Sequence, residues 1–442
     1  MTNSELAIQF FLQIAVILFI CKLVGFVAAK FGQPQVVAEM IAGVMLGPSL
    51  FGYFFPLWQQ AIFPWDPTQT QRDSQSYLYP ASQLGLAIYM FIIGMEFRWD
   101  IIKIHLKTSI AVSVAGMVAP FLLGAGLAAY LYKHTDLFGA KTSLNESMLF
   151  LGASMCITAF PMLARIIQTK GLNNTLMGTV AIGAGAIDDV TAWCLLAFVL
   201  ATFDGDMSHA VYAILGGAGF LAACLLIVKP LLFRCQALFL EKDETLSEIG
   251  LAVALACLAL GAWFSDLIQL HAVFGSFVVG IAIPRGKIAN ELCAKIQPLA
   301  VTLLLPLFFT YSGLNTQITL LNTSFLWFIS FLIFATAVVG KGVACTAAAK
   351  FAGLGTRDAL GIGTLMNARG LMELIIINIG LQRGIITDRL FATLVIMAIF
   401  TTLMASPIFD FLMRTRNGPL DASGSDVSNL PTSKTNGPVA RF

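Results

Sequence analysis

Charged side chains are scarce in this sequence of 442 residues: Asp, Glu, Lys and Arg make up 11% of it, whereas hydrophobic residues make up 58%. A soluble domain carries roughly 25% charged residues, which it needs to cover its surface. The scarcity excludes a soluble globular protein and a disordered one. With a net charge of only +2 and no long basic run, it also excludes nucleic-acid binding, which depends on Lys and Arg contacts to phosphates.

Three further features are missing. The eight cysteines contain no CxxC pair and lie mostly in apolar stretches, so we expect packing residues and neither a disulfide framework nor a metal site. The alternating runs of about ten residues that build a membrane β-barrel do not occur. No basic residue precedes Lys22, whereas a cleaved signal peptide begins with a basic region. We therefore expect an all-α integral membrane protein that keeps its first apolar segment as a span.

Thirteen apolar segments are each long enough for a membrane span, for which about 20 residues suffice. They cover 6–29, 35–52, 81–97, 108–132, 147–168, 175–202, 209–233, 247–264, 267–284, 298–313, 323–349, 358–381 and 388–413. Of the 26 Lys and Arg residues, eighteen fall in one set of loops and the C-terminal tail, and five fall in the opposite loops. Basic loops stay in the cytoplasm. This asymmetry predicts an external N-terminus and a cytoplasmic C-terminus.

Two connecting regions differ from the rest in composition. The loop 53–80 is rich in proline and aromatic residues and is expected to lie along the outer membrane surface. Residues 414–442 are polar and rich in Gly, Ser and Pro, which predicts a disordered cytoplasmic tail.

The order of the segments allows an inverted repeat, in which the first six segments correspond to the last six with opposite topology. Such repeats are typical of secondary transporters, whose sites lie where corresponding helices break near the membrane centre. Segment 147–168 contains Thr158 and Pro161, and its counterpart 358–381 contains Asn367, Arg369 and Gly370. The sequence therefore predicts two broken helices that meet in the membrane.

Ionisable residues inside a span are energetically costly and indicate function by default. Asp188 and Asp189 lie midway along segment 175–202, and Lys341 lies well inside segment 323–349. Adjacent residues on a helix point about 100° apart, so one carboxylate is expected to face a cavity while the other faces a partner. Lys341 is the expected partner.

Two further acids are open to two interpretations each. Arg369 and Glu373 are four residues apart and are expected to share a helix face, so Glu373 forms either a structural pair or part of the site. Glu39 lies either beside the transport pathway or merely near the cytoplasmic end of its helix.

At these residues the chain resembles the second family of monovalent cation:proton antiporters. That family includes bacterial sodium–proton antiporters with an Asp-Asp pair and the plant cation/proton exchangers. The resemblance covers about residues 8–413. It is carried by the motifs VAEMIAGVMLGPSLFG, FIIGMEF, ITAFPMLARI, GAIDDVTAW and NARGLMELIIINIGL.

The resemblance implies roles for individual residues. Asp189 matches the acid that carries the cation or proton, and Asp188 matches the acid that pairs with the lysine, here Lys341. Thr158 matches a polar position at the first helix break. Arg369 and Glu373 match the polar residues after the second break, where Asn367 is a further candidate.

The resemblance also implies a division into parts and an elevator-type mechanism. The core transport part would comprise 108–202 and 323–413, the dimerisation part 6–97 and 247–313, and a linker helix 209–233. We expect a homodimer in a lipid bilayer, such as a bacterial inner membrane. The potassium-efflux branch carries a nucleotide-binding regulatory domain after its membrane part, and none is expected in this chain.

The expected function is electrogenic exchange of Na⁺, or of K⁺ or Li⁺, for protons, without an enzyme activity or a cofactor beyond the transported ions. The main alternative is a sodium-coupled symporter for organic anions such as bile acids, which has a related fold. An intramembrane aspartyl protease is excluded because adjacent aspartates cannot converge on one proton. An ion channel is excluded because no symmetric filter loops are visible.

Overall fold

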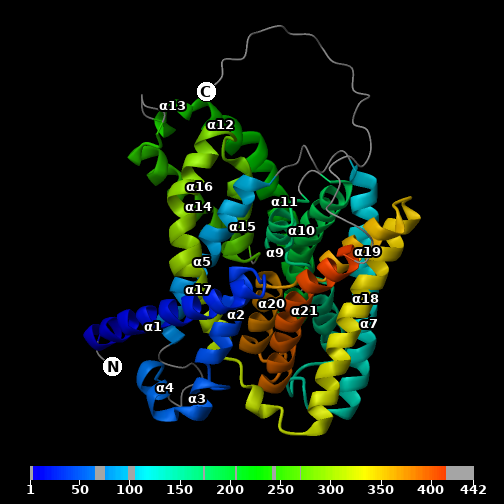
Figure 1. Ribbon diagram of the computed structural model, residues 1–442. Coiled ribbons are helices and arrows are strands. Elements are labelled where there is room, and N and C mark those ends of the chain that lie inside the picture. Colours follow the sequence, from blue (N-terminus) through cyan, green and yellow to red (C-terminus); the bar gives the residue numbers. More distant parts are fainter. Residues whose placement is uncertain are drawn as a thin grey trace.

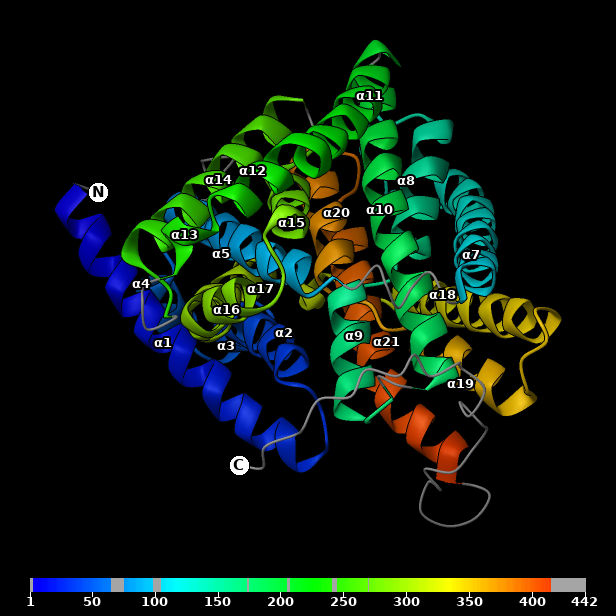
Figure 2. The same cartoon turned by 90° about the horizontal axis from the view of Figure 1, so that it is seen from above.

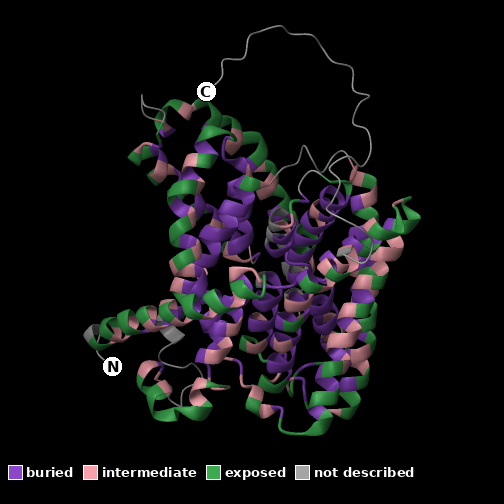
Figure 3. Ribbon diagram, viewed as in Figure 1, coloured by how far each residue is buried: buried purple, intermediate pink, exposed green. Residues whose placement is uncertain are grey.

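The computed structural model describes residues 3–64, 75–97, 105–172, 175–204, 207–240, 245–268 and 270–414. Within these ranges the secondary structure is helical, with two isolated β-bridges and no strand. The predicted all-α fold is therefore confirmed. The helices surround an interior in which the buried residues gather, while exposed residues face outward (Figures 1 and 3). Almost all of the predicted tail, from residue 415 onward, lies outside the described residues.

The helices follow one another in this order. The first half contains α1 (Asn3–Lys30), α2 (Gln35–Leu46), α3 (Phe51–Phe54), α4 (Pro56–Ile62), α5 (Gln75–Glu96), α7 (Leu106–His134), α8 (Leu144–Cys156), α9 (Phe160–Thr169) and α10 (Leu176–Asp204). The middle contains α11 (Met207–Ala223), the π-helical turn η2 (Cys224–Val228), α12 (Lys229–Arg234) and α13 (Gln236–Phe239). The second half contains α14 (Glu248–Leu267), α15 (Ala272–Ala282), α16 (Lys287–Leu299), η3 (Ala300–Leu304), α17 (Leu305–Leu314), η4 (Ile318–Leu320), α18 (Ser324–Phe351), α19 (Thr356–Leu365), α20 (Leu371–Gln382) and α21 (Asp388–Arg414).

Ten helical stretches among the described residues are long and apolar enough to cross a membrane. Each of the thirteen predicted segments overlaps a helix. Three of them, 147–168, 267–284 and 358–381, coincide with helices that are broken or short, namely α8 with α9, α15, and α19 with α20. The exact number of thirteen crossings stays a prediction.

Two helix boundaries differ from the sequence-based expectation. α5 already begins at Gln75, inside the predicted surface loop, and α16 begins at Lys287, eleven residues before the predicted span 298–313. Charged residues end an apolar run, but they do not end a helix that buries only one face. In α16 the buried residues Ile288, Leu292 and Ile296 recur every four positions, so the helix continues with its polar side exposed.

Seen from above, the helices form two groups (Figure 2). The helices α1–α5 and α14–α17 lie on one side, whereas α7–α10 and α18–α21 lie on the other. α11 and α12 run along the edge between the two groups. These groups are called here the frame and the core.

Two helix crossings in the frame are related by the inverted repeat. α2 packs against α17, and α5 packs against α15. The first crossing joins predicted segments two and ten, and the second joins segments three and nine. Because the repeat matches segment two with nine and segment three with ten, the two crossings are equivalent. Each crossing places glycine against glycine: Gly43 faces Gly313, and Gly94 faces Gly280. A Cβ atom on Gly94 would lie only 3.0 Å from the Cα atom of Gly280. Small residues let helix backbones approach closely, and both crossings depend on them.

Both predicted helix breaks are present and meet in the core. α8 ends at Cys156 and α9 begins at Phe160, while α19 ends at Leu365 and α20 begins at Leu371. The nonhelical segments between them are joined by a backbone hydrogen bond from Ala159 N to Ala368 O of 3.1 Å. Gly370 lies beside this contact, where a Cβ atom would lie 3.1 Å from Met162 Cγ and 3.5 Å from Ala159 Cβ. The predicted crossing of two broken helices is confirmed.

The turns α7–α8 and α20–α21 are tied together at one end of the core. Gly139 N donates to Ile385 O at 2.9 Å, and Thr387 N donates to Leu137 O at 3.0 Å. These two turns, one from each repeat, are therefore held at a fixed spacing.

Candidate functional site

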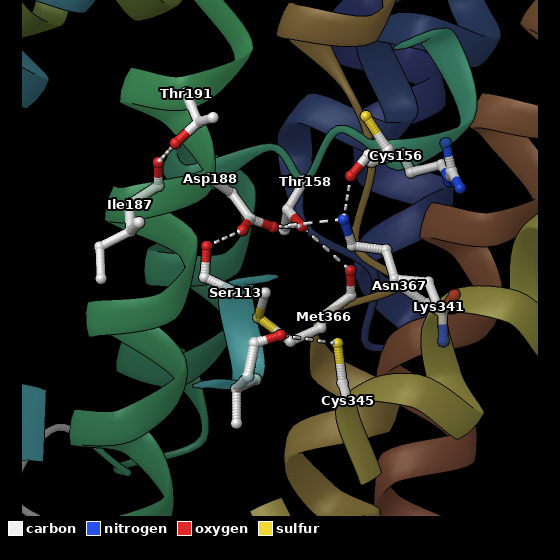
Figure 4. Close-up of polar contacts among 12 residues, drawn as sticks. Ser113, Cys156, Thr158, Ile187, Asp188, Thr191, Lys341, Cys345, Met366 and Asn367 are labelled. Atoms are coloured by element: carbon white, nitrogen blue, oxygen red, sulfur yellow. Dashed lines mark hydrogen bonds and ion pairs between the residues drawn. The ribbon is translucent and has the colours of Figure 1, made fainter. Parts of the chain in front are cut away.

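Asp188 is the centre of a buried polar cluster beside the first helix break (Figure 4). Its Oδ1 accepts a hydrogen bond of 2.6 Å from Ser113 Oγ on α7, and its Oδ2 accepts one of 2.6 Å from Thr158 Oγ1. Lys341 Nζ on α18 lies 3.2 Å from the same Oδ2, and both side chains of this ion pair are completely buried. Asp188 on α10 therefore links this helix to α7 and α18, and Lys341 balances its negative charge.

Two cations at the breaks also satisfy the C-terminal end of α8. Lys341 Nζ donates to the carbonyl of Cys156. Arg369 Nη1 donates to Ser154 O at 3.1 Å, and its Nη2 donates to Met155 O at 2.6 Å. The last carbonyls of a helix lack partners within the helix and carry partial negative charge. The two positive side chains therefore stabilise a buried helix end.

Arg369 forms a second ion pair, with Glu373. The Nη1–Oε1 distance is 3.1 Å, and both side chains are buried. Glu373 Oε2 has no hydrogen-bond partner among the described residues. The spacing of four residues thus correctly predicts the ion pair between Arg369 and Glu373. Oε2 of Glu373 takes no part in it.

Asp189 differs sharply from its neighbour. It is as completely buried as Asp188, yet neither of its oxygens has a hydrogen-bond partner in the part of the chain that the structure describes. It lies on another face of α10, which also carries Trp193 one turn later. The two adjacent acids therefore have different environments. Both carboxylate oxygens of Asp188 accept hydrogen bonds, whereas neither oxygen of Asp189 accepts one from the described residues.

Asn367 and Thr158 lie where the two breaks meet. Besides its bond to Asp188, Thr158 Oγ1 approaches Met366 O at 3.4 Å, which links the first break to the second. Asn367 Nδ2 donates to Gly363 O at 3.0 Å, and its Oδ1 is buried without a partner among the described residues. The structure thus brings Asn367 and Thr158 into one region with the aspartate pair.

Glu39 lies on a different element from this cluster. It is completely buried in α2 of the frame, where Gln35 Nε2 donates to its Oε1 at 3.1 Å. The structure therefore shows Glu39 as a buried acid of the frame, and its relation to the transport pathway stays open.

Ser113 is a site residue that sequence reasoning missed. A serine in an apolar helix usually bonds to a carbonyl of its own helix, and nothing in SIAVSVAGM distinguishes Ser113 from Ser109. The signal lies in the packing of α7 against α10, since only that packing shows which serine faces Asp188.

The site offers unpartnered side-chain oxygens of Asp189, Asn367 and Glu373 among the described residues. Among the described residues no group of three or more His, Cys, Asp or Glu side chains converges as a metal site would require. The available ligands are the carboxylate of Asp189 and oxygens at the helix breaks, and oxygen ligands suit hard cations.

The sequence matches known families and proteins along almost its whole length. Residues 15–415 match the family model of the transmembrane sodium/hydrogen exchanger. The Na⁺/H⁺ antiporter NhaS4 of Synechocystis is 36% identical over 92% of this chain and 97% of its own length. The K⁺/H⁺ antiporter 1 of Saccharomyces cerevisiae is 31% identical over 92% of this chain, which spans 46% of that protein.

A solved structure has the same fold. The sodium proton antiporter MjNhaP1 of Methanocaldococcus jannaschii superposes with a TM-score of 0.68, covering 95% of this chain and 100% of that one, at 13% sequence identity. At that identity the likeness shows the fold alone. The family model and the relatives place this chain in the sodium/hydrogen exchanger family: it is an integral membrane cation/proton antiporter and not an enzyme.

Proposed function

We propose that this antiporter carries Na⁺ and protons alternately on the carboxylate of Asp189. The supporting observation is the contrast between two buried neighbours. Asp188 accepts hydrogen bonds from Ser113, Thr158 and Lys341, whereas Asp189 accepts none from the described residues. A carboxylate without a fixed partner can bind a cation or a proton, one at a time. That competition couples the two ion movements.

Na⁺ is the proposed cation, with K⁺ and Li⁺ as the competitors to be tested. NhaS4, which this chain matches over nearly its full length, is named for Na⁺, and GerN of Bacillus cereus, also matched over nearly its full length, is named for Na⁺ and K⁺. The yeast relative, matched over about half its length, is named for K⁺. Discrimination between these ions depends on the number and rigidity of the oxygen ligands, so direct measurement has to decide it.

The test is exchange in proteoliposomes that contain a pH-sensitive dye, with Na⁺, K⁺ and Li⁺ titrated separately. Asp189→Asn should abolish cation-driven proton movement while the protein stays folded. Asp410→Asn is the matched control, because it removes a carboxylate from an ion pair with Lys170 (2.5 Å) that is partly exposed. Near-normal exchange by Asp189→Asn would remove Asp189 from the mechanism.

The ion pair suggests how exchange becomes electrogenic. When a cation binds at Asp189, Asp188 moves away from Lys341, and the desolvated lysine releases its proton. Asp188 keeps two hydroxyl donors when this happens, from Ser113 and Thr158, and their 2.6 Å bonds are shorter than its 3.2 Å contact with the ammonium. Because the cation also displaces the proton that Asp189 carried, one cation then exchanges for two protons.

The frame and the core provide the two bodies that elevator-type alternating access requires. The glycine crossings of α2 with α17 and of α5 with α15 bring the backbones of the frame into close contact, and α11 and α12 run along the edge between the frame and the core (Figure 2). The core would move with its ion against a frame that forms a homodimer, with the N-terminus outside the cell. Light scattering of the detergent-solubilised protein tests the dimer, and a monomeric mass would contradict it.

The organic-anion symporter is not favoured. Such a site needs a free cation at the helix breaks to bind a carboxylate. In this structure the Lys341 ammonium and both terminal nitrogens of Arg369 already bind Asp188, Glu373 or the carbonyls of α8.

A further inference from the structure

A small chamber lined by both polar and apolar side chains lies between the core and the frame, near the α20–α21 turn; its apolar lining residues are Phe308, Ile375 and Ile379. Its volume is about 10 Å³, which is enough for a single water molecule. Its lining includes the polar side chains of Tyr79 and Gln83 from α5, His271, Tyr311 from α17, and Asn378 and Gln382 from α20.

The chamber leads from the protein surface toward the interior. Gln382 is exposed and Tyr79 is 38% exposed, whereas Asn378 is 7% exposed. Polar side chains at a contact between membrane helices bond across the contact, and polar residues inside a membrane protein also mark ion pathways. The arrangement suits the passage of a polar species.

Hydrogen bonds between core and frame close the chamber in this state. Gln382 Nε2 on α20 donates to Tyr311 Oη on α17 at 2.9 Å, and Asn378 Nδ2 donates to Ser312 Oγ at 3.1 Å. Because each bond joins the two groups of helices, any displacement of the core along the frame must break both. The chamber therefore has to change shape during the transport cycle.

One polar atom on the chamber wall indicates an occupant. Gln83 Oε1 is buried and has no hydrogen-bond partner among the described residues. Buried polar atoms are normally satisfied by protein or by ordered water, and the chamber carries polar side chains and is large enough for one water. A water molecule there would donate to this oxygen.

His271 connects the chamber to the helix that carries Asp189. It precedes α15 and has a φ of 67°, the only positive φ among non-glycine residues in the described ranges. Strained backbone of this kind is concentrated at functional sites. The imidazole lines the chamber and stacks on Trp193 of α10, with 6.2 Å between ring centroids.

Trp193 continues the connection to the ion site. It is four residues from Asp189 on α10, so both share a helix face. Its Nε1 is buried and has no partner within the described part of the chain. Polar groups thus run from the exposed Gln382 through the chamber, His271 and Trp193 to the unpartnered carboxylate.

We propose that this chamber holds one bound water in the present state and forms the passage by which the monovalent cation reaches Asp189 from the side of the α20–α21 turn. It is too small here for a cation with any hydration shell, so this side is closed until the core moves. The proposal rests on Asp189 as the ion carrier and adds Gln83 and His271 as residues of the passage.

The first test is labelling of Gln83→Cys by a charged, membrane-impermeant methanethiosulfonate, applied to each face of sealed vesicles in turn. Labelling above that of the parent protein should occur only from the side of the α20–α21 turn, and its rate should change several-fold with the imposed cation and pH gradients. Gln60→Cys on the exposed α4 should label regardless of gradient, and the fully buried Gln13→Cys should not label. Labelling of Gln83→Cys from the opposite face, or at a rate that ignores the gradients, would overturn the proposal.

The second test measures transport with the cation presented at one face at a time. Gln83→Met and His271→Asn should raise the KM at the side of the α20–α21 turn several-fold and leave the KM at the other face unchanged. Asn tolerates a positive φ and keeps a side-chain acceptor for the start of α15. His134→Asn, at the exposed end of α7, is the matched control. If the wild type exchanges normally and both variants behave like the control, the chamber is not the passage of the cation. If the wild type shows no cation-driven proton movement, the proposed function itself is contradicted.

Discussion

Removal of the Lys341 ammonium should destabilise this protein far more than removal of another lysine in a membrane helix. Lys341→Ala leaves the Asp188 carboxylate without its counter-charge and takes a donor from the Cys156 carbonyl. Breaking a buried ion pair by removing one partner costs about 3–5 kcal/mol. Lys22 on α1 is exposed, and surface substitutions typically change stability by less than about 0.5 kcal/mol.

The assay is the apparent melting temperature of the detergent-solubilised protein, followed by tryptophan fluorescence. Lys341→Ala should melt clearly below the wild type and Lys22→Ala close to it. The double variant Asp188→Asn/Lys341→Ala should recover part of the loss, because no uncompensated charge remains and contacting residues are not additive. Equal melting temperatures for the two single lysine variants, or strictly additive losses in the double variant, would refute the assignment of stability to this pair.

Three other outcomes are expected from the same structure. Na⁺-driven exchange should respond to a potassium–valinomycin potential, since each charge is worth about 2.3 kcal/mol per 100 mV, and Asp188→Asn should weaken that response; a wild-type reversal point that ignores the potential would mean one-for-one exchange. Arg369→Ala should lower the melting temperature more than Glu373→Gln, because Arg369 also holds two carbonyls of α8, and the reverse order would contradict this role. Gly43→Ala should cost about 1–3 kcal/mol by overpacking against the backbone of α17, whereas Gly126→Ala on α7, with open space around it, should stabilise by roughly 0.5–1 kcal/mol; similar melting temperatures for both would show that the crossing can relax.

The parts of the fold that sequence reasoning predicted are those with a strong local signal. Long apolar runs are required by the membrane itself, and the breaks at Thr158 and at Asn367 interrupt such runs with polar residues that an unbroken span would not need. The charge of Lys341 demands a buried counter-charge, and the sequence offers few candidates. These expectations follow from the cost of unsatisfied groups in a bilayer.

The remaining parts depend on which helix faces meet. Ser113 is a donor to Asp188 only because α7 packs on α10, and a single serine carries no sign of its partner. His271 looked like one of four scattered histidines in the sequence, since neither its positive φ nor its contact with Trp193 is visible there. The amphipathic start of α16 was missed because its charged face ends the apolar run at a point where the helix continues.

The tie between the α7–α8 and α20–α21 turns gives spectroscopy an internal reference. Both turns belong to the core, and backbone hydrogen bonds hold them at a fixed spacing. Spin labels at Lys141 and Arg383, which are exposed in these two turns, should give one constant distance in every ionic condition. Against that constant pair, a change measured from either label to α4 would report movement of these two turns together relative to the frame and exclude a rearrangement between them.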